Sequence, residues 1–196
     1  MIDRNNKVLF IHVPKSGGTS IESFFSKNLN VVTTTKEKHY TFKDYKREYG
    51  IEFKDHYSFL IIRNPWDSMV SLYLYLRKPL FDFDIPEDFN DFIQNFDLSK
   101  FRNQLKEKGW DQATADLIEF GQIKWYDKDV DKICKFEIYE KEMEIVSENI
   151  GIDLCNLEKE NVSEKRKEYK SYYNEKSRLI VEERNKRIIN IFDYEF

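Results

Sequence analysis

KVLFIHVPKSGGTS, residues 7–20, is the stretch of sequence that decides the fold. Its first half, Lys7–Val13, is a run of β-branched and aromatic residues, which predicts a buried strand that ends before Pro14. Helical periodicity begins directly afterwards, over Thr19–Phe25. A pair of glycines therefore lies in the turn between a predicted strand and a predicted helix.

This turn has the composition of a phosphate-binding loop. Gly17 and Gly18 let consecutive backbone N–H groups converge on one anion, and the start of the helix adds the positive end of its dipole. Lys15 supplies a mobile cation, while Thr19 and Ser20 supply hydroxyl donors, one of which we expect to cap the helix. The alternative is a turn that only joins a strand to a helix. Because the chain has only 6 glycines in 196 residues, their pairing here favours a binding role.

The remaining sequence alternates predicted strands with predicted helices. Strands are predicted within His56–Ile62 and Asp131–Ile138, and helices over Thr41–Tyr49, Trp66–Leu76, Asp88–Phe96, Asp111–Phe120 and Tyr172–Phe192, with one more ending near Asn149. This order predicts an α/β fold of the P-loop-like, three-layer α/β/α type, with a mainly parallel central sheet flanked by helices. The length fits a single domain, residues 1–196, in which residues 78–126 form a helical insertion.

A second candidate phosphate contact lies in FLIIRNPWDSMVS, residues 59–71. Arg63 follows a predicted buried strand, and ligands of open α/β sheets bind at the carboxyl ends of the strands. Its planar guanidinium suits a second phosphate, and Ser71 adds a hydroxyl on the helix that follows. A structural ion pair is the alternative for Arg63. An enzyme that binds Mg²⁺ and a nucleoside triphosphate often has an aspartate at such a strand end. Arginine there favours a doubly phosphorylated nucleotide bound without metal.

Composition excludes several other classes of protein. The formal net charge of −4 argues against a general nucleic-acid binder. The two cysteines, Cys134 and Cys155, lack the spacing of a zinc site or a disulfide scaffold. The sequence shows no apolar run of the roughly 20 residues that a membrane span needs, and no signal peptide. We therefore expect a cytoplasmic protein without an integral membrane segment.

HVPKSGGTS, residues 12–20, and RNPWDSMVS, residues 63–71, together resemble the phosphate motifs of sulfotransferases that use 3′-phosphoadenosine 5′-phosphosulfate (PAPS). The likeness is to the carbohydrate-type branch, sulfotransferase family 2. It covers most of the chain and continues at Lys135–Glu137, Asn161–Ser163, Tyr172–Asn174 and Phe192–Phe196. Residues 78–126 match least, and we expect them to face and select the acceptor.

The resemblance implies a role for each matching residue. Lys15 would contact the bridging or sulfuryl oxygens of PAPS, and Arg63 and Ser71 would bind its 3′-phosphate. The 5′-phosphate would be held by the remainder of the loop: Pro14, Ser16, Gly17, Gly18, Thr19 and Ser20. A further loop would close over the cofactor with Ser163, Lys165 and Arg166. The acceptor would be a glycan or small molecule with a free hydroxyl, and no metal would be required.

The acceptor hydroxyl needs a general base. His39 lies where carbohydrate sulfotransferases of this type carry their histidine base, and Glu22 or Glu37 are its alternatives. Charge would develop on the leaving phosphate in a loose in-line transition state, where Lys15 can neutralise it. Two other functions remain open: a P-loop nucleotide or metabolite kinase, and a non-catalytic nucleotide-binding module.

Overall fold

The structure is a computed structural model that describes residues 1–29, 31, 34, 37–50, 55–155, 157 and 167–196. The chain forms two compact units. The first consists of Met1–Arg63 and Trp125–Ser163, and the second of Asn64–Lys124 and Glu164–Phe196.

The first unit contains a four-stranded sheet in the order β1-β2-β3-β4. Its strands are Ile2–Asp3 (β1), Val8–Ile11 (β2), Tyr57–Ile62 (β3) and Lys132–Lys135 (β4). β1 pairs with β2 in antiparallel orientation, and β2, β3 and β4 are parallel, with Phe10 opposite Phe59 and Ile61 opposite Cys134. Because the three parallel strands point the same way, the residues that follow them gather at one edge of the sheet.

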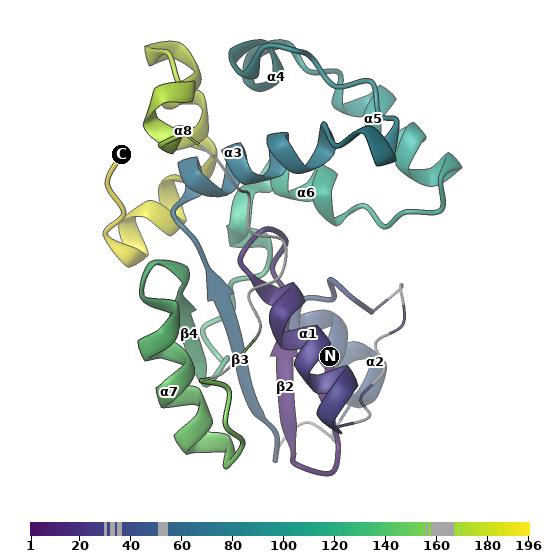
Figure 1. The fold of residues 1–196 in the computed structure, drawn as a ribbon, viewed down its shortest axis with the longest axis vertical. Helices are drawn as coiled ribbons and strands as arrows, with labels where there is room; N and C mark the ends of the chain where they lie inside the picture. Colours follow the sequence, from purple (N-terminus) through teal and green to yellow (C-terminus); the bar gives the residue numbers. More distant parts are fainter. Residues whose placement is uncertain (30, 32–33, 35–36, 51–54, 156, 158–166) are drawn as a thin grey trace. The chain divides into compact units, whose positions relative to one another are not determined.

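Two helices of the first unit, α1 (Gly18–Leu29) and α7 (Tyr139–Ile150), lie along the same face of this sheet (Figure 1). Ile21 and Phe25 of α1 and Met143 and Val146 of α7 join one buried cluster with Val8, Phe10, Phe59, Ile61 and Cys134. A third helix, α2 (Phe42–Tyr49), is capped by Thr41, whose side chain accepts from the backbone of Asp44, and ends at Gly50. The buried side chains of α1 hold this helix against the sheet. Its N-terminus follows β2 after a short loop.

The second unit is helical. Its helices are α3 (Pro65–Leu76), α4 (Phe89–Asn95), α5 (Leu98–Glu107), α6 (Ala113–Phe120) and α8 (Glu175–Phe192), with 3₁₀ turns at Pro79–Phe81, Gly121–Lys124 and Tyr169–Tyr172. Asn64 caps α3 by accepting from the backbone of Trp66 and Asp67. Trp66 in turn donates from Nε1 to the carbonyl of Arg178 at 3.1 Å, which ties α3 to α8.

The predicted α/β class with a mainly parallel sheet is confirmed. The finer prediction, a P-loop-like three-layer arrangement, stays a prediction. The N-cap prediction for the first helix is wrong, because α1 begins at Gly18 and includes Thr19 and Ser20 in its first turn. Helix α5 was not predicted. It lies within residues 78–126, together with α4 and α6, and the role of that segment towards an acceptor stays a prediction.

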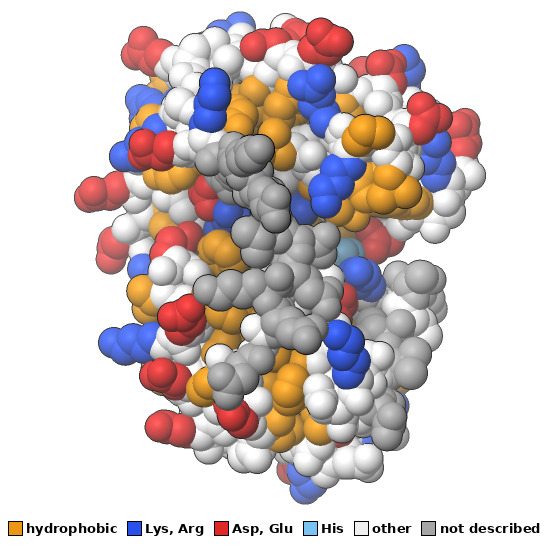
Figure 2. All heavy atoms as spheres, viewed as in Figure 1, with side chains coloured by type: hydrophobic (Ala, Val, Ile, Leu, Met, Phe, Trp, Pro, Cys, Tyr) orange, Lys and Arg blue, Asp and Glu red, His pale blue; other side chains and the backbone are white. Residues whose placement is uncertain are grey.

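Charged side chains of both signs are interspersed on the face of the chain that Figure 2 shows. This distribution is what 32 basic and 36 acidic residues in 196 produce when neither sign is segregated. In the described part of the chain, every helix is too short or too polar to traverse a lipid bilayer.

Candidate functional site

The loop between β2 and α1 has an unusual backbone. Lys15 has a φ of 66° and Gly17 a φ of 79°, so two residues separated by one adopt the left-handed region. For a lysine this conformation costs on the order of 1–3 kcal/mol, and such strain persists where the surrounding structure enforces it. Alternation of left- and right-handed residues turns successive N–H groups to one side, which is the geometry of an anion-binding concavity.

Close packing explains why both loop positions are glycine. A Cβ on Gly17 would lie 2.8 Å from Cε2 of Phe136, and a Cβ on Gly18 would lie 2.3 Å from Cδ2 of His12. Both distances are far below van der Waals contact. The rings of Phe136 and His12 therefore pack directly against the loop backbone. Only glycine at positions 17 and 18 permits so close an approach.

Arg63 lies at the end of β3 and is directed at this loop. Its Nη1 donates to the carbonyl oxygen of Lys15 at 3.2 Å. The guanidinium carbon lies 4.3 Å from the centroid of the Phe136 ring, within the range of a cation–π interaction. The strand end that was predicted to carry a phosphate ligand is thus brought to the glycine loop.

Phe136 is a site residue that the sequence analysis missed as such. It follows β4 in the 3₁₀ turn Phe136–Ile138, so the third parallel strand also delivers a residue to the loop. Its ring contacts the loop at Gly17 and carries the guanidinium of Arg63. The available signal was its position, directly after a predicted strand within the segment that resembles the family.

His39 is held on both sides. Its Nδ1 lies 3.0 Å from the carbonyl oxygen of His12, and its own carbonyl oxygen accepts from Nε1 of Trp125 at 3.0 Å. A carbonyl oxygen can only accept, so Nδ1 carries the proton of this hydrogen bond. In the neutral imidazole, Nε2 is then the basic nitrogen. The predicted base is therefore in the first unit, next to the residue where β2 leads into the loop.

Burial, followed by the effect of the neighbouring His12, lowers the pKa of His39 to about 3. The side chain is thus neutral over the whole physiological range. Such an imidazole is a weak base in the resting state. It can still take a proton from a hydroxyl in the transition state, when the hydroxyl becomes acidic as its bond to the electrophile forms.

A buried polar network lies behind the two histidines. Nδ1 of His12 is 2.8 Å from Oε1 of Glu22, and Nζ of Lys38 is 3.2 Å from Oε2 of the same carboxylate. Burial lowers the pKa of His12. Burial acts to raise the pKa of Glu22, but the contacts with His12 and Lys38 outweigh it and lower that pKa to about 2. Glu22 is therefore an ionised structural partner, which does not favour it as the base.

The remaining predicted residues are placed as follows. Pro14 and Ser16 are buried in the loop, and Thr19 and Ser20 are partly buried in the first turn of α1. Ser71 is partly buried on α3, in the second unit. Glu37, the other alternative base, accepts through Oε1 from the hydroxyl of Tyr49. Ser163, Lys165 and Arg166 lie outside the described residues.

Within the described ranges, no three or more His, Cys, Asp and Glu side chains come together as a metal site would need.

A comparison with families of known proteins gives one finding. The model described as "Sulfotransferase family" matches residues 1–195. Comparison with curated proteins and with solved structures gives no match.

Proposed function

Because the chain belongs to the sulfotransferase family, we propose that it transfers a sulfuryl group from PAPS to a hydroxyl group of a carbohydrate or a similar metabolite. The observation that carries this proposal is the hydrogen bond from Arg63 to the carbonyl of Lys15. It joins the two motifs that were expected to contact the two phosphate ends of the donor. A neutral histidine, His39, lies in a separate turn, and its ring contacts the carbonyl of His12, the residue that follows β2 and leads into the same loop.

The described residues fit an anionic donor. Lys15 and Gly17 both have a positive φ, which is a feature of backbone concavities that bind anions, and the N-terminus of α1 adds its dipole. At Gly17 and Gly18 the space that a Cβ would take is filled by the rings of Phe136 and His12, so the loop backbone is held against these rings. In the proposal, Pro14–Ser20 hold the 5′-phosphosulfate. Arg63 binds the 3′-phosphate, and Ser71 donates to the same phosphate, as the resemblance implies.

Bound PAPS supplies the sulfuryl group and a phosphate leaving group. Lys15 neutralises the negative charge that builds on the leaving oxygen, together with the backbone N–H groups of the loop. Its left-handed backbone fixes the start of the side chain relative to those groups. Loss of one such donor typically lowers the rate about 10²–10³-fold.

His39 is the proposed general base. Its Nδ1 proton is committed to the His12 carbonyl, so Nε2 is the atom that accepts the proton of the acceptor hydroxyl. The Trp125 hydrogen bond to the His39 carbonyl holds the backbone from the other side. The ring therefore has a fixed tautomer and orientation before an acceptor arrives, which is how a base contributes through positioning.

Thermal unfolding with two nucleotides tests the donor. Adenosine 3′,5′-bisphosphate, the product expected from PAPS, should raise the melting temperature without metal, because a ligand at 100 times its dissociation constant stabilises by about 2.7 kcal/mol. A shift with ATP and Mg²⁺ alone would overturn the proposal and favour a kinase. A shift with the bisphosphate, but no transfer to any acceptor, would favour a non-catalytic nucleotide-binding module.

Transfer itself is tested with PAPS carrying ³⁵S and a panel of glycans and small hydroxyl compounds. Lys15→Ala should lower incorporation about 10²–10³-fold. Lys27→Ala is the matched control. It removes a lysine from the last turn of α1, the helix that follows the loop, and should leave incorporation unchanged. Equal activity of the two variants would remove Lys15 from the reaction.

A further inference from the structure

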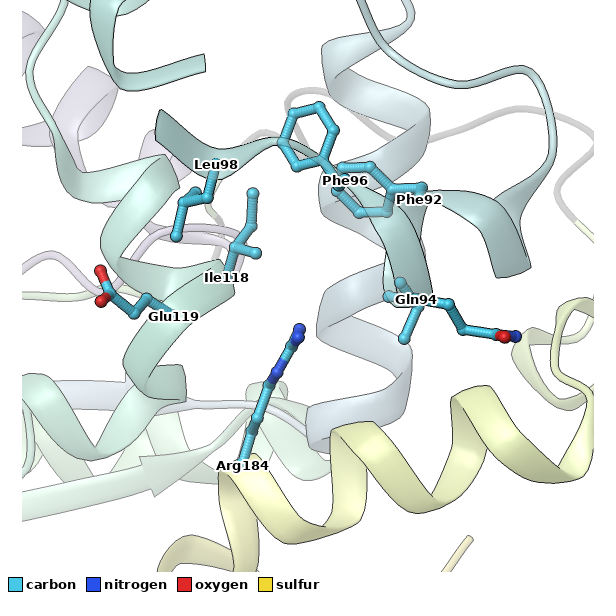
Figure 3. Close-up of a pocket in the computed structure, with 8 residues that line it drawn as sticks. Phe92, Gln94, Phe96, Leu98, Ile118, Glu119 and Arg184 are labelled. Atoms are coloured by element: carbon cyan, nitrogen blue, oxygen red, sulfur yellow. The ribbon is translucent and has the colours of Figure 1, made fainter. Parts of the chain in front are cut away.

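The second unit contains a pocket that the proposed reaction does not use (Figure 3). Its volume is about 140 Å³. The walls come from α4 and the residue that follows it, from the start of α5 and from α6, and one side chain of α8 reaches into it. All of these elements belong to the second unit, so the pocket can be described without reference to the glycine loop.

The walls of the pocket are apolar and firmly packed. They are formed by Phe92, Ile93, Phe96, Leu98 and Ile118. Phe92, Ile93 and Ile118 are at most 5% exposed, and the rings of Phe92 and Phe96 lie 4.9 Å apart. A cavity of about 150 Å³ lined by such side chains can hold a benzene ring. The pocket therefore has the size and the lining for one aromatic ring or a compact aliphatic group.

One cation enters this apolar space. The guanidinium of Arg184 extends from α8 between the side chains of the pocket wall (Figure 3). Among the described residues, no carboxylate lies within ion-pair distance of it, and burial lowers its pKa. Arg184 as a whole is exposed, so its guanidinium can exchange water for the carboxylate of a ligand, which would bind it through charge-assisted hydrogen bonds.

The polar neighbours of Arg184 are engaged elsewhere. The carboxylate of Glu119 accepts from Arg102 at 2.5 Å and is directed away from Arg184 (Figure 3). The amide of Gln94 donates to Asn174 at 3.4 Å. Asp116 beside Glu119 pairs with both Arg102 and Lys124, so this group of four charges is neutral without Arg184. The net charge left at the pocket is that of Arg184.

We propose that this pocket binds a small aromatic or compact aliphatic carboxylate, with its apolar part against Phe92, Phe96 and Ile118 and its carboxylate on Arg184. A planar guanidinium binds a carboxylate through two parallel hydrogen bonds, which sets the orientation of the ligand. The proposal does not depend on the sulfuryl-transfer reaction.

Benzoate is the probe, with benzamide as its neutral counterpart and acetate as the same charge without a ring. Saturation-transfer NMR and thermal unfolding of the full chain are measured with each compound. Benzoate should bind at millimolar concentration or below, and benzamide and acetate at least tenfold more weakly. Arg184→Gln should weaken benzoate at least tenfold. Arg187→Gln, which removes an exposed arginine one turn further along α8, is the matched control and should not weaken it.

A second variant fills the pocket without touching the charge. Leu98→Phe adds a ring to a partly buried wall position and should abolish benzoate binding while the chain stays folded. The proposal is overturned if benzoate does not bind, or if Arg184→Gln binds it as the wild type does. It is also overturned if Lys15→Ala, rather than Arg184→Gln, removes binding, since the anion site would then be the glycine loop.

Discussion

The imidazole rings of His12 and His39 lie with their centroids 4.6 Å apart and their planes tilted by 56°. Burial lowers the pKa of both rings, and each ring would repel a second positive charge on the other. The pair is therefore neutral at physiological pH. Only His39 was predicted to be functional, and its neighbour acts on it through both the ring contact and the backbone carbonyl.

Replacement of His39 tests its role as the base. His39→Gln keeps a side chain of similar length that can still donate to the His12 carbonyl, but it removes the basic nitrogen. We expect transfer from PAPS to fall about 10²–10⁴-fold. The affinity for adenosine 3′,5′-bisphosphate, measured by calorimetry, should stay within a factor of two or so of the wild-type value, since no donor of the glycine loop is lost.

His56→Gln is the control for this experiment, because His56 precedes β3 at the end of the strand opposite Arg63. It should not change turnover. If His39→Gln retains full turnover, the base is another residue.

Acidification should destabilise the protein before its carboxylates are protonated. The pKa of His39 is about 3 in the folded chain and about 6.5 when unfolded. Below pH 6.5 the unfolded chain therefore binds a proton that the folded chain does not, so the free energy of unfolding rises with pH in this range and falls on acidification. At pH 5 the loss from one such histidine is about 2 kcal/mol relative to pH 8.

Urea unfolding between pH 8 and pH 5 measures this loss, and His39→Gln should reduce the slope of the free energy against pH. Below about pH 4.5, Glu22 adds a further loss, because its pKa of about 2 in the folded chain lies below its unfolded value. A slope that is the same in the variant and the wild type would mean that His39 titrates normally.

The fold was largely accessible from the sequence because its two central strands, β2 and β3, are short and mainly apolar. Val8–Ile11 and Tyr57–Ile62 stand out as buried runs, and each ends at a residue with a chemical role. Helix α5 was missed because only Phe101 and Leu105 are buried among mainly polar residues, a weak apolar face. The sequence predicted that α1 starts after Gly18, because glycine is a poor helix former. The helix nevertheless begins at Gly18, where close packing against His12 requires a glycine.

The site was accessible only in part. Lys15, Arg63 and His39 could be nominated from residue type and position, since each has a chemistry that few residues share. The supporting roles of His12 and Phe136 depend on contacts that only the folded chain makes, and Phe136 and Gly17 are more than 100 residues apart. No local pattern carries that information. The polar contact between His12 and Glu22 could not be predicted either, because it depends on how α1 faces the strand.

Arg63 should bind a phosphate through a guanidinium that Phe136 orients. Arg63→Met keeps an apolar side chain on the Phe136 ring but removes the charge. We expect affinity for adenosine 3′,5′-bisphosphate to fall about 10- to 100-fold, as for loss of charge-assisted hydrogen bonds of about 1.5–3 kcal/mol. Phe136→Leu keeps the arginine and removes the ring, and its effect should be smaller, about two- to fivefold, as for a cation–π interaction.

Calorimetric titration of both variants with adenosine 3′,5′-bisphosphate and with adenosine 5′-monophosphate gives the comparison. The monophosphate lacks the 3′-phosphate, so its affinity should be unaffected by Arg63→Met. An equal loss of affinity for both nucleotides would show that Arg63 supports the loop through the Lys15 carbonyl rather than the phosphate.

Gly18 should be the position at which the loop tolerates the least change. In Gly18→Ala the new Cβ would lie 2.3 Å from the His12 ring, which is 4% exposed and tied to Glu22. Neither the ring nor the start of α1 can move freely, so we expect a loss of about 1–3 kcal/mol in the free energy of unfolding, as for an overpacked core. Displacement of the loop should also reduce the thermal shift with adenosine 3′,5′-bisphosphate.

Gly151→Ala is the matched control, since a Cβ there meets nothing within 4 Å although the residue has a φ of 67°. It should cost about 1–2 kcal/mol through its backbone conformation alone and leave the nucleotide shift intact. The measurement is urea unfolding of both variants, with and without the nucleotide. If Gly18→Ala binds adenosine 3′,5′-bisphosphate as tightly as Gly151→Ala does, close packing on His12 does not shape the anion site, and the glycine serves only the turn.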